Sequence, residues 1–169
     1  ACKRSVRFLT LSAEHAIEHH SLNEACLLLT QALNQASKHP QLEQCRGPLQ
    51  QRLGRCYISL GKLTEAGATL TTALEAFGEL STTKQVPNGL TFRFECKRLR
   101  LLERAYSLMP HRYNVLHHNG QHEELACVYE QLARLSMAQQ QTAPAEFWAL
   151  KAVVAAIDVW IKTSQVLRT

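Results

Sequence analysis

The chain has 169 residues, 46% of them hydrophobic, which suits one domain or a short run of repeats. Seven glycines and five prolines are too few for a low-complexity or fibrous protein. No apolar run reaches the ~20 residues that a membrane span needs. The formal net charge of +5 is a mild basic excess, well short of a nucleic-acid-binding signature. Ala, Leu, Gln and Glu dominate and strand-forming runs are scarce, so we predict an all-α chain.

The six cysteines are widely scattered and form no C-x-x-C pair. Several fall on apolar helix faces, so we interpret them as buried, reduced thiols rather than as a disulfide framework. This interpretation predicts a cytoplasmic or nuclear protein. The chain begins Ala-Cys-Lys without Met, shows no secretory signal and ends in a predicted helix, so we expect a fragment of a longer protein.

The first predicted helix spans residues 5–19, and a second begins at Ser21. Glu24 follows Ser21 by three residues, which is the spacing of a capping box that satisfies free backbone N–H groups at a helix start. The second helix is predicted to end at His39-Pro40, because proline cannot continue the hydrogen-bond ladder.

Six further helical segments are predicted along the rest of the chain. They are a helix over 41–60 with Pro48 in the first turn of its regular part, a helix over 63–77, a long helix over 90–109, a short helical turn over 111–118, and helices over 121–139 and 143–166. Gly78, Pro87 and Asn88-Gly89 predict a loop over 78–90. Thr142 is predicted to cap the last helix.

The stretch 49–77 resembles a tetratricopeptide repeat (TPR), a helix–turn–helix unit of about 34 residues. The matching residues are Leu53-Gly54-x-x-Tyr57, then Ala66, Leu70 and Ala73, with the turn at Leu60-Gly61-Lys62. Gly54 and Ala66 are small where two helices must approach closely, and Tyr57 is large where a gap between helices must be filled. These residues make 47–78 the clearest repeat-like pair.

Two weaker copies of the same spacing flank the central pair, one over 5–38 and one over 121–166, and the segment 79–120 is irregular. The resemblance implies one TPR-like domain over 1–169. It would be an all-α TPR-like α-solenoid of about three helix pairs plus an extra or irregular helix.

TPR proteins hold partner peptides or helices on a concave surface lined by the first helix of each pair. The resemblance therefore implies contact candidates on the outward side of those helices. In the central pair they are Gln51 and Arg55, and in the last pair they are Glu130 and Arg134.

A basic stripe is predicted on the 90–109 helix. Its members lie at steps of four, three and four and so share one face: Arg93, Lys97, Arg100 and Arg104. We interpret the stripe as a surface for an acidic partner segment. The alternative is an ordinary solvated face whose Arg stems cover apolar surface. No aromatic platform is interleaved with these cations, which disfavours nucleic acid as the partner.

The last predicted helix is apolar nearly all round, which indicates burial on both sides or a missing partner. Burial against the preceding helix accounts for only part of this surface. Trp148 and Trp160 are therefore candidate anchors for a docked partner helix.

Neither histidine group predicts a metal site. His15 and His19 lack a third ligand, and the cluster His117, His118 and His122 lacks a paired Cys motif. No nucleophile, base and acid set can be assembled, so we predict neither catalysis nor a cofactor.

These observations together predict a non-catalytic protein–protein interaction module or scaffold. Its partner would be a protein with an acidic or amphipathic helical segment, and no membrane is involved. The alternative is a regulatory or substrate-positioning helical domain of a larger enzyme, whose catalytic part would lie outside this chain.

Overall fold

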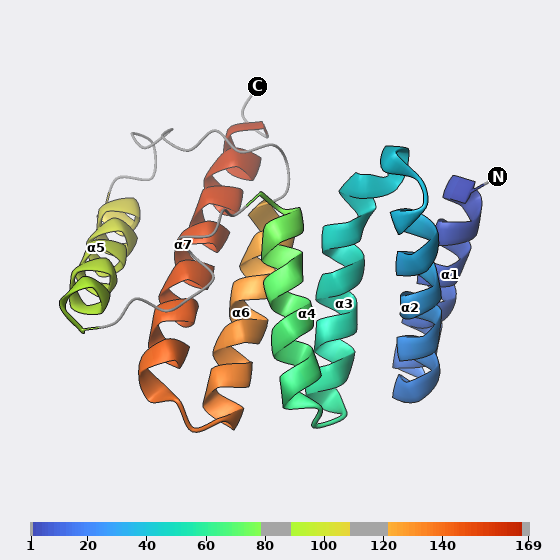
Figure 1. The fold of residues 1–169 in the computed structure, drawn as a ribbon. Coiled ribbons are helices and arrows are strands. Elements are labelled where there is room, and N and C mark those ends of the chain that lie inside the picture. Colours follow the sequence, from blue (N-terminus) through green and yellow to red (C-terminus); the bar gives the residue numbers. More distant parts are fainter. Residues whose placement is uncertain (1, 79–88, 109–121, 167–169) are drawn as a thin grey trace. The chain divides into compact units, whose positions relative to one another are not determined.

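A computed structural model describes residues 2–78, 89–108 and 122–166 (Figure 1). Within these residues every regular element is helical, which confirms the predicted all-α class. The contacts divide the chain into two compact units, residues 1–84 and 85–169, and each unit is described by itself. No helix within the described ranges is both long enough and apolar enough to cross a membrane.

The first unit holds α1 (Cys2–Glu18), α2 (Leu22–Ser37), a short 3-10 helix η1 (Pro40–Cys45), α3 (Arg46–Ser59) and α4 (Leu63–Ala76). Each α-helix packs against the next one along the chain (Figure 1). Pro40 ends the α2 ladder as predicted, and Pro48 lies in the first turn of α3. The predicted helix 41–60 therefore divides into η1 and α3 at Cys45.

One buried cluster joins α1, α2, η1 and α3 of the first unit. Its members from α1 and α2 are mostly alanines, whose small size lets the helices approach closely, with larger residues from η1 and α3: Val6, Ala13, Ala16, Ala25, Leu29, Ala32, Ala36, Leu42, Leu49, Leu53 and Cys56. Tyr57 packs half-buried against this cluster, as its predicted gap-filling role requires.

The predicted close approach at Gly54 is confirmed. A Cβ atom placed on Gly54 would lie 2.7 Å from Leu70 Cδ2 on α4, and one on Gly47 would lie 2.8 Å from the Phe77 ring. Only glycine gives α3 and α4 this separation, because such contacts are shorter than van der Waals distance.

The second unit holds α5 (Gly89–Leu108), α6 (His122–Ala138) and α7 (Thr142–Val166). Helices α6 and α7 form an antiparallel pair, and α5 packs against α7 (Figure 1). Residues 79–88 of the predicted loop 78–90 lie outside the described residues, as does the predicted turn 111–118. Gly89 and Leu90, predicted as part of the loop, belong to α5.

The three helix pairs, α1–α2, α3–α4 and α6–α7, are joined by turns of the same geometry. In each turn one residue has a positive φ: His20 (59°), Gly61 (72°) and Gln140 (59°). The N–H of this residue donates to the carbonyl three residues back, and the next N–H donates to the carbonyl five residues back. These bonds satisfy carbonyls that would be left unpaired at the helix end. Positions in the three pairs can therefore be matched by their distance from the turn residue.

Two predicted helix caps are wrong. Ser21 precedes α2 but makes no side-chain capping bond, because its ψ of 59° departs from the extended conformation of a capping residue. Thr142 is the first residue of α7 rather than its cap. In both places the turn geometry, with its positive φ, sets the helix start.

Candidate functional site

Helix α5 is held on α7 along one face. The Phe92 and Phe147 ring centroids lie 6.2 Å apart, and Cys96 and Leu99 are buried on the same side. Arg100 forms an ion pair with Glu146 of α7. One arginine of the predicted stripe therefore has a carboxylate partner inside the unit.

The other members of the stripe face solvent. The basic row of α5, defined as Arg93, Lys97, Arg100 and Arg104, is exposed along its whole length. Among the described residues, only Arg100 of this row has a carboxylate partner. Arg98 lies away from the row and pairs with Glu95 at 3.2 Å. The row therefore presents three cations that nothing in the described chain neutralises.

An apolar row lies beside the basic row. It consists of four side chains that are 64–80% exposed: Leu90, Phe94, Leu101 and Leu108. Their steps of four, seven and seven keep them on one helical face. The sequence pattern missed this row, because apolar residues at helical spacing are normally counted as core. The signal that could have found it is the width of the apolar face, which exceeds what one packed neighbour covers.

Together the two rows form the α5 surface, an exposed apolar strip bordered by cations. An isolated exposed Leu needs no explanation, but a row of large exposed apolar side chains on one helix is unusual on a protein surface. Surfaces of this kind accept a segment that carries apolar side chains at complementary spacing and carboxylates along its edge.

The residues predicted to line a concave binding surface lie on two helices, α3 and α6. Gln51 is half-buried and Arg55 is exposed, both on α3. On α6, Glu130 and Arg134 pair with each other at 2.6 Å, one helical turn apart. An exposed i, i+4 pair of this kind contributes about 0.3–0.5 kcal/mol and leaves both side chains accessible to a partner.

Trp148 lies inside the second unit. It is only 5% exposed, stacks on Tyr129 with centroids 5.8 Å apart, and meets Phe147 edge to face at 5.1 Å. The Lys151 ammonium lies 5.0–5.7 Å from the centroids of all three rings. Trp148 therefore packs α7 against α6 and leaves little surface for a partner. The side chain of Trp160 lies outside the described part of the structure.

The histidines form no metal centre in the described part of the chain. His15 and His19 contact each other through their Nε2 atoms at 3.1 Å, and no group of three potential ligands occurs among the described residues. His117 and His118 lie outside those residues, as does the side chain of His122.

Comparisons with protein-family models, with curated proteins and with solved structures found no match to this chain.

Proposed function

We propose that the chain is a non-catalytic protein-interaction module built from TPR-like helix pairs. Support comes from the three turns with equivalent hydrogen bonds and from the close α3–α4 approach at Gly54. The Glu14–Arg52 ion pair of 3.0 Å supports it too, because it joins the first helices of successive pairs as stacking requires. Such pairs provide rigid surfaces rather than reacting groups.

The α5 surface is the part of the module that we assign to the partner. The observation that carries the assignment is the apolar row lying beside three unneutralised cations. A partner helix with Leu or Phe at i, i+3, i+4 and i+7 would cover the apolar row. Asp or Glu along one edge of that helix would meet Arg93, Lys97 and Arg104.

A matched pair of neighbouring residues tests this proposal. Lys97 lies in the basic row and Arg98 lies away from it, so Lys97→Glu and Arg98→Glu change the net charge equally at positions facing different ways. Arg100 is unsuitable, because its reversal would place a carboxylate beside Glu146 and loosen α5 from α7.

The probe is a labelled synthetic helix with a Leu stripe flanked by Glu, titrated with the full chain by fluorescence anisotropy. We expect Lys97→Glu to weaken binding about tenfold, equivalent to about 1.4 kcal/mol, and Arg98→Glu to change it less than twofold. Phe94→Asp should abolish binding, because it places a charge within the apolar row. Circular dichroism should show unchanged helicity for all three variants.

Equal weakening by the two charge reversals would contradict the assignment, because it would show long-range attraction without a seated partner. Tighter binding of anionic vesicles or single-stranded RNA than of the acidic helix would also contradict it. A photo-reactive residue at Leu101 would then identify the natural partner in cell extract by cross-linking.

A further inference from the structure

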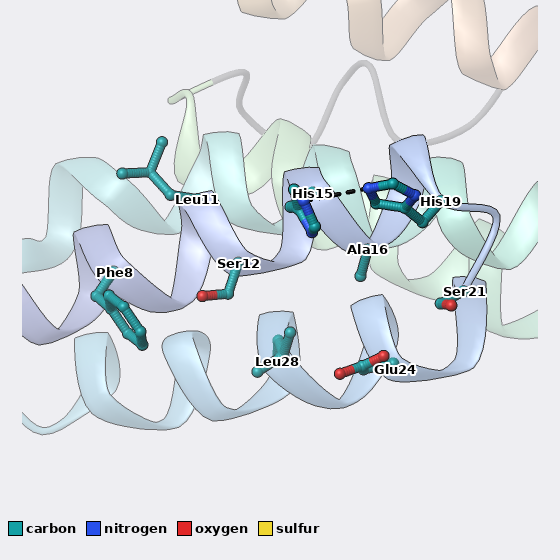
Figure 2. Close-up of a pocket in the computed structure, with 9 residues that line it drawn as sticks. All are labelled: Phe8, Leu11, Ser12, His15, Ala16, His19, Ser21, Glu24 and Leu28. Carbon is teal, nitrogen blue, oxygen red and sulfur yellow. Dashed lines mark hydrogen bonds between the residues drawn. The ribbon is translucent and has the colours of Figure 1, made fainter.

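The first helix pair exposes an apolar face. A groove of about 690 Å³ runs between α1 and α2, and Figure 2 shows Phe8 and Ala16 of α1 directed toward the helix that carries Glu24 and Leu28. Phe8 is 70% and Leu11 is 55% exposed. Faces of stacked helix pairs that stay in contact with water are ordinarily polar, which keeps such proteins soluble.

The corresponding positions in the other pairs are covered. Phe8 lies twelve residues before its turn residue, as do Leu49 in the second pair and Val128 in the third. Leu49 is 2% exposed and Val128 is 0% exposed. The groove on the first pair is therefore a helix-stacking face that nothing in the described chain covers.

The third pair exposes the opposite face. A trough of about 380 Å³ lies between α6 and α7, with Ala126, Ala152, Val153 and Ala156 along it and the carboxylates of Glu123 and Glu130 at its edge. Its small side chains leave room for a large one. In size and charge the trough is thus the complement of the Phe8 face.

The face of the first pair that corresponds to the trough shows which side chain such a face contacts. Ala126, Ala152 and Ala156 match Val6, Ala32 and Ala36 by their distance from the turn residue. In the first pair those three residues are buried in the same cluster as Leu49 of the next pair. Leu49 is the match of Phe8.

We propose that a second copy of the chain docks head to tail, with Phe8 of one copy seated in the α6–α7 trough of the other. The contact continues between copies the stacking that joins α1 and α2 to α3 within one copy. Phe8 is larger than Leu49 and Ala126 is smaller than Val6, so the substitutions compensate in volume.

Charge supports the same register. Within the chain, Glu14 of α1 forms an ion pair with Arg52 of α3. By distance from the turn residue, Glu14 matches Arg134 in the third pair and Arg52 matches Leu11 in the first pair. Because the helices involved run parallel, Arg7 of the second copy then falls opposite Glu130, one turn earlier. The Phe8 face and the α6–α7 trough therefore attract each other, whereas two copies of the same face would repel each other.

The interface uses different surfaces on the two copies, so it is heterologous and can propagate into open chains. This property gives the proposal a sharp test. Phe8→Glu blocks only the groove and Val153→Glu blocks only the trough, and both residues are exposed enough that neither change should unfold the chain.

Sedimentation velocity of the full chain at about 10–300 µM is the measurement. We expect the average mass of the wild type to rise with concentration above the 19.0 kDa of the monomer. Each blocked variant alone should stay monomeric. An equimolar mixture of the two should form a dimer and nothing larger, because each supplies the face that the other lacks.

A charge exchange tests the register. Arg7→Glu should prevent assembly, and mixing it with Glu130→Arg should restore it. Lys97→Glu on the α5 surface should assemble normally, which separates this proposal from the one for α5. A monomeric wild type throughout the range would overturn the proposal. So would two blocked variants that fail to pair, or a closed dimer that neither variant disrupts.

Discussion

Gly54 sets the separation of α3 and α4, and it illustrates how one missing Cβ atom shapes a helix pair. An added Cβ would lie 2.7 Å from Leu70 Cδ2 and 2.8 Å from its Cγ. Leu70 is fully buried and has no room to retreat. The sequence could predict this contact, because a small residue at that place in a TPR-like pattern has a steric reason.

We expect Gly54→Ala to destabilise the chain by about 1–2 kcal/mol, although alanine is the better helix former by about 1 kcal/mol. Urea unfolding followed by circular dichroism measures the change. In a double-mutant cycle with Leu70→Ala, the cost of Gly54→Ala should shrink, since the clash is removed. A Gly54→Ala variant at least as stable as the wild type would show that the helices can move apart freely.

The Cys56 thiol makes stability depend on alkaline pH. Burial, with the neighbouring Cys26 thiol, raises the pKa of Cys56 from its ordinary 9.0 to about 11. Between these values the unfolded chain loses this proton while the folded chain keeps it. The folded state then binds more protons, so the free energy of unfolding falls as pH rises from about 9 to 11.

The expected loss from this group is about 1–3 kcal/mol by pH 11. Lysines and tyrosines titrate in the same window, so the informative quantity is the difference from a Cys56→Ala chain measured by urea unfolding at each pH. The stability gap between the two chains should narrow as pH rises. A gap that stays constant would mean that the Cys56 pKa is not raised by the fold.

At the scale of elements, two of the turns contain backbone strain that the sequence does not reveal. His20 and Gln140 adopt the same left-handed conformation as Gly61, although residues with a Cβ atom strain there. A periodicity argument locates these turns but cannot reveal the sign of φ at a histidine or a glutamine.

We expect His20→Gly and Gln140→Gly each to stabilise the chain by up to about 1 kcal/mol, and Gly61→Ala to destabilise it by a similar amount. Thermal and urea unfolding of the three variants measure the effect. All three positions are exposed, so packing changes do not confuse the comparison. A destabilising effect of His20→Gly or Gln140→Gly, or a stabilising effect of Gly61→Ala, would contradict the shared turn geometry.

The α5 helix shows where sequence analysis stops. Its position and its basic row could be predicted from residue spacing alone. Which of its apolar residues are covered could not, because Phe92 and Phe94 differ only in facing α7 or solvent. That distinction depends on the neighbour against which the helix packs. The same reason applies to Trp148, whose size suggested an anchor and whose surroundings made it core.

At the scale of the whole molecule, local patterns predicted the helices and their turns, whereas the surfaces required the packed structure. The helix bounds agree with the predicted ranges to within a few residues, because apolar period and proline act locally. The groove beside Phe8 and the trough beside Val153 become meaningful only when equivalent positions of different pairs are compared for burial. Spacing in the sequence carries no information about which outer face stays uncovered.

The placement of the two tryptophans has a spectroscopic consequence. Residues 1–84 contain no tryptophan, so both indole chromophores belong to the second unit. Trp148 is enclosed by Tyr129, Phe147 and the Lys151 ammonium, and its emission will shift when that environment opens. Indole fluorescence therefore reports the melting of α6 and α7 alone, while far-ultraviolet ellipticity averages over every helix. The separation between the two melting curves becomes a direct gauge of how strongly one half of the chain supports the other.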